Sequence, residues 1–156
     1  MDWIEVNGVG LRCELAGAGR ATLVLIHELG GCIESWDETL PALQREFRTL
    51  RFDQRGFGLS EKVTGNLQLN DIVNDMTGLL DALGITGPCH LAGSAMGAGI
   101  AAAFAARHPA RAASLIVQSL VTRSSPALRI WPARRERNSS RGICRQRGRS
   151  RRARCP

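Results

Sequence analysis

Residues 91–98 have the sequence Leu91-Ala92-Gly93-Ser94-Ala95-Met96-Gly97-Ala98 and lie between an apolar run and a stretch of small residues. The apolar run, residues 88–92, predicts a buried strand. Residues 97–108 are rich in alanine and are followed by Pro109, which predicts a helix that ends there. Glycines on both sides of Ala95 allow a tight turn between them. The stretch therefore predicts a strand, a sharp turn and a helix.

Five more strands are predicted outside this turn. They are apolar throughout or alternate between apolar and polar residues, and they cover residues 2–6, 11–16, 22–27, 48–53 and 113–118. Asn7-Gly8 joins the first two, and this dipeptide is typical of a tight hairpin between antiparallel strands. The run at 22–27 is continuously apolar, which predicts a strand buried on both faces.

Two more helices are predicted between these strands. The first would have Ser35 as its N-cap and Pro41 as a break or in its first turn, and its apolar face holds Trp36, Leu40, Leu43 and Phe47. The second covers residues 69–83 and ends at Gly84. Because strands and helices alternate after the hairpin, we expect an α/β fold. Its sheet would be mostly parallel, and ligands would bind at the carboxyl ends of the strands.

The turn at residues 93–97 has the setting of the nucleophile elbow G-x-S-x-G, in which the central side chain stands at the mouth of the sheet. The central residue here is Ala95, and a methyl group has no lone pair with which to attack a carbonyl. Ser94 is the substitute candidate, but it would place Met96 where close packing requires glycine. We therefore place Ala95 at the nucleophile position and keep Ser94 as the weaker candidate.

Two other segments follow predicted strands. They are His27-Glu28-Leu29-Gly30-Gly31 and Asp53-Gln54-Arg55-Gly56-Phe57-Gly58-Leu59-Ser60. With these segments and the elbow, residues 3–119 resemble the α/β-hydrolase superfamily, and most of all the 3-oxoadipate enol-lactonase-like hydrolases. The resemblance implies a hydrolase of small carboxylic esters or lactones that needs no cofactor and no metal.

The same resemblance implies an oxyanion hole built from two backbone amides, those of Leu29 and Met96. Glu28 replaces the glycine usual in this loop, and its carboxylate would oppose a negative oxygen unless it points away. Asp53 and Arg55 are expected to brace their loop rather than to take part in chemistry.

The acid and the base of such an enzyme are expected on loops after residue 119, where this chain has arginines instead. The three histidines, His27, His90 and His108, all lie elsewhere, and we expect structural roles for them. With alanine at the nucleophile position and no acid or base, the chain is expected to be inactive as written.

Charge divides the chain into two parts. Residues 1–122 hold nine Lys and Arg against thirteen acids, whereas residues 123–156 hold twelve Arg and one acid. The second part has no hydrophobic period, which predicts disorder. We therefore expect an incomplete α/β-hydrolase core over residues 1–120, without its last strands and cap, and an Arg-rich tail over residues 121–156.

The tail contains no Lys, which favours a frameshift in GC-rich DNA near residues 119–123, and hence a truncated core, over an evolved arm. The alternative is a non-enzymatic hydrolase-like fragment whose tail binds nucleic acid through its arginines. In either case residues 113–118 would form an exposed apolar edge strand, which predicts aggregation.

The remaining composition is ordinary for one globular domain, with 156 residues of which 44% are hydrophobic. No apolar run is long enough to span a bilayer and no secretion signal is visible, so we expect a cytoplasmic protein without membrane contact. The five cysteines are an odd number and are expected to be reduced thiols.

A remote alternative is a dinucleotide-binding oxidoreductase. Gly93, Gly97 and Gly99 also fit the glycine pattern of short-chain dehydrogenases. That family uses a catalytic tyrosine, and this chain contains none.

Overall fold

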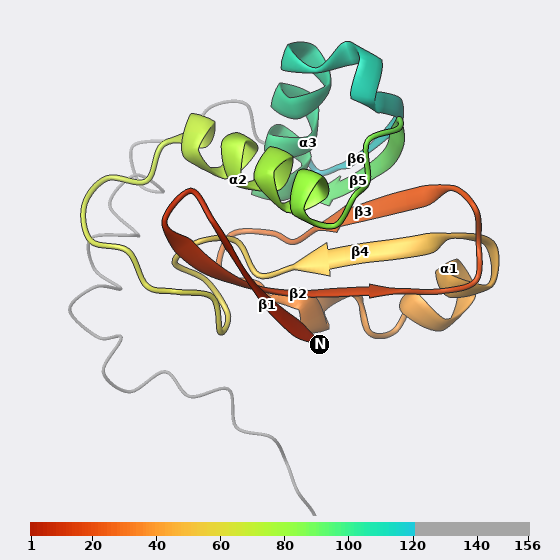
Figure 1. The fold of residues 1–156 in the computed structure, drawn as a ribbon, viewed down its shortest axis with the longest axis horizontal. Helices are drawn as coiled ribbons and strands as arrows, with labels where there is room; N and C mark the ends of the chain where they lie inside the picture. Colours follow the sequence, from red (N-terminus) through yellow and green to blue (C-terminus); the bar gives the residue numbers. More distant parts are fainter. Residues whose placement is uncertain (121–156) are drawn as a thin grey trace, which may run out of the picture. The chain divides into compact units, whose positions relative to one another are not determined.

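A computed structural model describes residues 1–120 of the chain. It contains strands, three α-helices and two short 3-10 helices (Figure 1). The predictions of a disordered Arg-rich tail over residues 121–156, and of nucleic-acid binding by that tail, lie outside the described residues. No helix within residues 1–120 is long and apolar enough to cross a membrane.

The strands form one six-stranded sheet in the order β1-β2-β4-β3-β5-β6. They are β1 (Asp2–Val6), β2 (Val9–Ala16), β3 (Thr22–Ile26), β4 (Arg48–Phe52), β5 (Cys89–Ser94) and β6 (Ala112–Gln118). β2 is antiparallel to β1 and β4, and the remaining neighbours are parallel. Asn7 and Gly8 form the hairpin turn with φ values of 49° and 73°. The α/β fold with a mostly parallel sheet and an antiparallel N-terminal hairpin is confirmed.

Helices cover both faces of the sheet (Figure 1). α2 (Leu69–Ala82) and α3 (Met96–Arg107) lie on one face, and α1 (Leu40–Glu46) lies on the other. Val24 and Ile26 of β3 pack in the same cluster as α2 and α3, whereas Leu23 and Leu25 pack with Leu40 of α1. Because successive residues of a strand point to opposite faces, a strand covered on both sides must be apolar throughout. All five residues of β3 are accordingly buried.

The segment between β3 and β4 is not the single helix that we expected. It forms the 3-10 helix η1 (Ile33–Trp36) and then α1, whose N-cap is Thr39 and not Ser35. Ser35 lies inside η1, where its hydroxyl accepts a hydrogen bond from the N–H of Cys32 at 3.4 Å. Pro41 lies in the first turn of α1, where a missing N–H costs no helical hydrogen bond.

The predicted end of the second helix at Gly84 is confirmed. Gly84 has a φ of 68°, which glycine adopts without strain. Its N–H donates to the carbonyl of Asp81 at 3.0 Å, and the N–H of Ile85 donates to the carbonyl of Leu80 at 2.8 Å. These two bonds form a Schellman motif, which satisfies carbonyls at the end of α2.

β6 lies at the edge of the sheet, and β5 is its one neighbour within residues 1–120. Leu115, Ile116 and Val117 are 40%, 60% and 43% exposed. Because these three residues are consecutive, apolar side chains are exposed on both faces of the strand. The apolar edge expected from the sequence is therefore present.

Candidate active site

Ala95 connects β5 directly to α3 and has an unusual backbone conformation. Its φ is 49° and its ψ is −108°, a region in which the Cβ atom of an L residue crowds its own backbone. Its N–H donates to the carbonyl oxygen of Gln118 in β6 at 2.8 Å, and its carbonyl accepts from the N–H of Gly99 at 3.3 Å. The sharp turn is thus centred on Ala95, whose N–H is hydrogen-bonded to β6 and whose carbonyl is hydrogen-bonded to α3.

Gly93 and Gly97 flank Ala95 at positions where no side chain fits. A Cβ atom on Gly93 would lie 2.3 Å from the carbonyl oxygen of Gly97, and one on Gly97 would lie 2.2 Å from the carbonyl oxygen of Ile26. These distances are shorter than van der Waals contact, and the blocking atoms belong to the backbone. The close approach of β3, β5 and α3 therefore requires both glycines.

Ser94 has a different place. It is the last residue of β5 and pairs with Gln118 of β6. A turn centred on Ser94 would have Ala92 and Met96 at the positions that the tight turn leaves to glycine. The geometry of the turn therefore gives Ser94 the position before the centre.

The loop after β3 begins beside this turn. Ile26 of β3 lies opposite Gly93 of β5, and the two strands are parallel. Leu29 and Met96 thus follow the carboxyl ends of neighbouring strands. Within residues 1–120 neither the N–H of Leu29 nor that of Met96 donates a hydrogen bond to a protein acceptor. Two unoccupied amides at one edge of a sheet can bind an oxygen that carries negative charge.

Glu28 holds its carboxylate within its own loop. Its Oε1 accepts a hydrogen bond from the hydroxyl of Ser35 at 3.1 Å. A Cβ atom on Gly31 would lie 2.5 Å from the same oxygen, so the carboxylate covers the backbone of Gly31. We expected the Glu28 carboxylate to oppose a negative oxygen unless it points away. In the structure it is directed to Gly31 and η1.

His27 is a buried, neutral histidine. Its Nε2 accepts a hydrogen bond from the backbone N–H of Gln54 at 3.1 Å, and this requires the proton on Nδ1, which lies 2.8 Å from the carbonyl of Glu28. Burial lowers the pKa of His27. Both ring nitrogens are occupied by the backbone, so His27 joins the loops after β3 and β4 and has no free nitrogen to act as a base.

The other two histidines lie away from Ala95. His90 is near the amino end of β5, with its Nδ1 2.8 Å from the hydroxyl of Ser114. His108 follows the last residue of α3, and its ring centroid lies 5.0 Å from that of Phe104. The 12 residues of α3 separate it from Ala95, and at about 1.5 Å per residue this is about 18 Å.

The segment after β4 is held by buried charges. Asp53 is 0% exposed and accepts hydrogen bonds from the backbone N–H groups of Ile33 and Leu59, both at 2.7 Å, and from Arg12 at 3.3 Å. Three donors stabilise a buried carboxylate, and they leave it little capacity for chemistry. Asp53 thus braces the loop, as the sequence analysis expected.

Arg55 makes the second brace by pairing with both carboxylate oxygens of Asp75 in α2. Sequence reasoning missed Asp75, although its position carries a signal. It lies next to Met76 and among apolar residues on the buried side of α2, and an acid there needs a partner. Arg12 was also missed, and its place in the strand β2 gives no comparable signal.

Cys32, Glu34 and Asp53 bring their ligand atoms within 4.8 Å of one another, as a metal site would. Arg12 forms ion pairs with both carboxylates and already supplies positive charge there. Its hydrogen bond lowers the pKa of Glu34 to about 2, while burial raises the pKa of the Cys32 thiol to about 11. A protonated thiol and two paired carboxylates do not fit a metal ion.

Comparison with known proteins identifies the fold family. A sequence model of the alpha/beta hydrolase fold matches residues 21–140. The chain belongs to the alpha/beta hydrolase fold family. The matched region contains the loop after β3, the segment after β4 and the turn at Ala95. This hydrolase family, and not the dinucleotide-binding alternative, thus accounts for Gly93 and Gly97.

Individual proteins are similar to the chain over most of its length. The dihydrolipoyllysine-residue acetyltransferase component of the acetoin cleaving system from Pseudomonas putida is 39% identical over 112 residues, which are 71% of this chain. The putative carbamate hydrolase RutD of Pantoea ananatis is 38% identical over 101 residues, or 64% of the chain. The crystal structure of an enol-lactonase from Burkholderia xenovorans is 35% identical over 71% of the chain, with a TM-score of 0.68.

These relatives are longer proteins. The matched part covers 30% of the acetyltransferase component, 36% of the carbamate hydrolase and 44% of the lactonase chain. The chain therefore spans between about a third and a half of the length of these relatives.

Proposed function

We propose that the carboxyl edge of this sheet is the site of an ester- or lactone-hydrolase fold that lacks the nucleophile. The observation that carries the proposal is Ala95 in its strained conformation between Gly93 and Gly97. In the hydrolase elbow this position holds the attacking side chain. The methyl group of Ala95 cannot form an acyl-enzyme, so the chain does not hydrolyse esters through this residue.

The same edge supports binding of a small carboxylic compound. The free amides of Leu29 and Met96 follow neighbouring strands, and backbone donors of this kind stabilise a negative oxygen. The named lactonase and carbamate hydrolase relatives support a small ester, lactone or carboxylate as the ligand class. The proposed activity is therefore binding of a carboxylate without covalent catalysis.

Hydrolysis of p-nitrophenyl acetate tests the catalytic half of this proposal. The wild-type chain and the Ser94→Ala variant should both release p-nitrophenol at the buffer rate. The Ala95→Ser variant should do the same, because both ring nitrogens of His27 are already bonded. If the wild type hydrolyses the ester and the Ser94→Ala variant does not, the assignment of the elbow to Ala95 is wrong. Turnover by Ala95→Ser would show that a base is available.

Titration with a small carboxylate such as adipate tests the binding half. The backbone amide resonances of Leu29 and Met96 should shift and saturate together, while that of Gly10 in the N-terminal hairpin should not move. Absence of any shift at Leu29 and Met96 would overturn the assignment of these amides to an anion-binding site.

A further part of the proposal concerns the change of composition near residue 120. Residues 123–156 contain arginine and no lysine, which supports a shifted reading frame. The family match reaches residue 140, so the sequence of the coding DNA is needed to determine at which codon the similarity to the family ends. Translation from codon 113 in all three frames should show that a hydrolase pattern continues in another frame. If none of the frames continues such a pattern, the proposed frameshift is wrong.

A further inference from the structure

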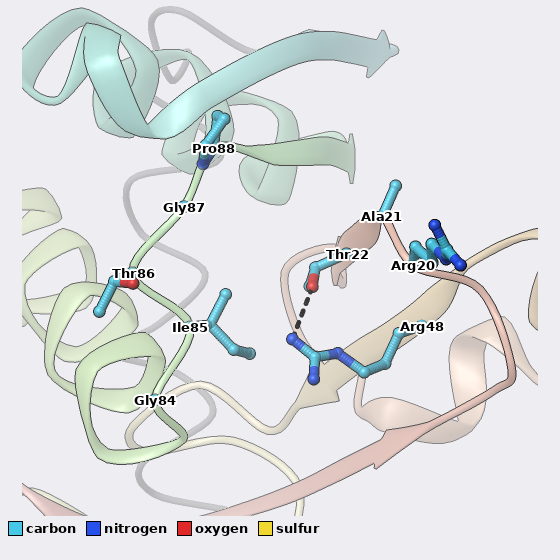
Figure 2. A pocket seen from close by; sticks show the side chains of 9 residues that line it. All are labelled: Arg20, Ala21, Thr22, Arg48, Gly84, Ile85, Thr86, Gly87 and Pro88. Atoms are coloured by element: carbon cyan, nitrogen blue, oxygen red, sulfur yellow. Dashed lines mark hydrogen bonds between the residues drawn. The ribbon is translucent and has the colours of Figure 1, made fainter.

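A cavity of about 200 Å³ lies at the amino ends of the parallel strands, lined by residues 20–22, Arg48 and the loop of residues 84–88 (Figure 2). Thr22 and Arg48 are the first residues of β3 and β4, and Pro88 directly precedes β5. Ala95 follows the carboxyl end of β5, so the cavity and the candidate active site lie at opposite ends of the parallel strands. The cavity is therefore a separate feature of the fold.

Arg48 extends its guanidinium into this space, with Ile85 facing it across the cavity (Figure 2). Its Nη2 donates to the hydroxyl of Thr22 at 3.2 Å. Its Nε is buried and has no hydrogen-bond partner. A buried N–H without an acceptor costs about 1 to 3 kcal/mol. The Nη1 of Arg48 is not buried and makes no hydrogen bond within residues 1–120, so it is the Arg48 donor that a ligand in the cavity can reach.

Positive charge in the cavity is not compensated within residues 1–120. Neither Arg48 nor the exposed Arg20, which also lines the cavity, has a carboxylate oxygen within 4.0 Å. Arg45 and Arg107 also lack one, whereas Arg12, Arg51, Arg55 and Arg111 each have one. The acid nearest in sequence to the loop, Asp81, is paired with Arg111 at 2.7 Å. Two arginines without carboxylate partners favour an anionic ligand.

The loop of residues 84–88 adds backbone donors, and two of its carbonyls are already hydrogen-bonded. Over the described part of the chain, the N–H groups of Thr86 and Gly87 donate to no protein acceptor. The carbonyl of Ile85 is occupied by Arg111 at 2.7 Å, and the carbonyl of Gly87 by the thiol of Cys89 at 3.6 Å. A group rich in acceptor oxygens is the complement of such a wall.

We propose that this cavity binds a phosphate group, held by Arg48 and by the amides of residues 86 and 87. A water molecule takes up about 30 Å³ in the liquid, so the space accommodates a tetrahedral oxyanion in place of several waters. Guanidinium groups bind phosphate oxygens through charge-assisted hydrogen bonds. The ligand would connect β3, β4 and the loop between α2 and β5, and it would stabilise the fold by binding only the native state.

The arginines of residues 123–156 also attract phosphate, so the test needs a readout for each site. In ¹⁵N-labelled full-length protein at constant ionic strength, inorganic phosphate should shift the Arg48 Nε resonance and the amides of Thr86 and Gly87. The shifts should saturate, and an equal concentration of chloride should not produce them. Shifts that increase linearly without saturation, or that spare Arg48, would overturn the proposal.

Variants give the second arm. Arg48→Met keeps the apolar stem and should weaken phosphate binding at the Thr86 and Gly87 amides at least tenfold. Arg107→Met is the matched control, because Arg107 lies on α3 and binds Asn70 and Asn74 instead. Its affinity should equal that of the wild type. Equal affinities in all three proteins would contradict the assignment, and circular dichroism checks that each variant folds.

Ribose 5-phosphate distinguishes the source of the phosphate group. If it shifts the same resonances with an affinity equal to or higher than that of inorganic phosphate, the cavity binds a phosphomonoester. If only inorganic phosphate binds, the site holds the free ion. If neither shifts the Arg48 resonance, the cavity is not a phosphate site.

Discussion

The backbone N–H of Ala95 donates a hydrogen bond to the carbonyl oxygen of Gln118 at 2.8 Å. This bond connects the strained turn before α3 to the last residue of the exposed edge strand β6. The conformation of Ala95 therefore depends on the pairing of β5 with β6. A substitution that disrupts this pairing is expected to change the backbone conformation at the candidate active site.

Replacing Ala95 with glycine should stabilise the chain. A non-glycine residue in such a region costs about 1 to 3 kcal/mol, and the greater freedom of glycine in the unfolded chain offsets about 1 kcal/mol of the relief. We expect Ala95→Gly to raise the free energy of unfolding in urea by about 1 kcal/mol. Ala102→Gly in the middle of α3 is the control and should lower it by about 1 kcal/mol. A loss at both positions would argue against strain at Ala95.

Adding a methyl group at Gly97 should strongly destabilise the fold. The new Cβ would lie 2.2 Å from the carbonyl of Ile26, and a backbone atom cannot move aside as a flexible side chain can. We expect Gly97→Ala to cost about 3 kcal/mol or more, at the upper end for overpacking. Gly10→Ala, where the nearest atom would be at 3.7 Å, is the matched change without a clash. Equal midpoints in urea for the two variants would contradict the close packing of α3 on β3.

Local patterns in the sequence predict the fold where burial and turn chemistry act over a few residues. β3 is recognisable because helices cover both of its faces, and the end of α2 is recognisable because Gly84 supplies a positive φ. The break between η1 and α1 is not visible, because Trp36 packs in the same cluster as Leu40 and so keeps the helical spacing. The pair between Arg12 and Asp53 joins residues 41 positions apart, and no local pattern records it.

Breaking the buried ion pair between Arg55 and Asp75 should cost more than breaking an exposed one. The Asp75 side chain is 1% exposed, so Arg55→Met would leave a buried carboxylate without its charge partner. We expect a loss of about 3 to 5 kcal/mol in the free energy of unfolding. Asp81→Asn, at a side chain that is 58% exposed, is the comparison and should cost less than about 1 kcal/mol. Similar losses in the two variants would mean that the Arg55–Asp75 pair stabilises the fold no more than an exposed ion pair does.

Glu34 should make the stability depend on pH in the acid range. Its hydrogen bond with Arg12 lowers the pKa from 4.5 to about 2, so the folded state binds the proton more weakly than the unfolded state. The stabilisation is complete above pH 4.5 and is lost as the pH falls toward 2. Because the side chain is 42% exposed, solvent limits the gain to about 1 kcal/mol.

The Glu34→Gln variant measures this contribution. Its midpoint in urea should be lower than that of the wild type at pH 7, and the difference should shrink between pH 4.5 and 2. Glu38→Gln, at an exposed acid without an ion pair in the described part of the chain, should follow the wild type. A constant difference across this pH range would argue that Glu34 does not bind Arg12 as a carboxylate.

The exposed edge of β6 should cause the chain to associate. Ala112–Gln118 contains no charged residue and no proline, which are the devices that commonly protect an edge strand. Ile116 is 60% exposed, so Ile116→Lys adds a charge to the edge without removing much buried surface. We expect this variant to stay monomeric in analytical ultracentrifugation at concentrations where the wild type forms larger species. Asn66→Lys, which adds the same single positive charge at an exposed position of the loop before α2, should associate as the wild type does. If both lysine variants were monomeric, net charge rather than the edge of β6 would control association.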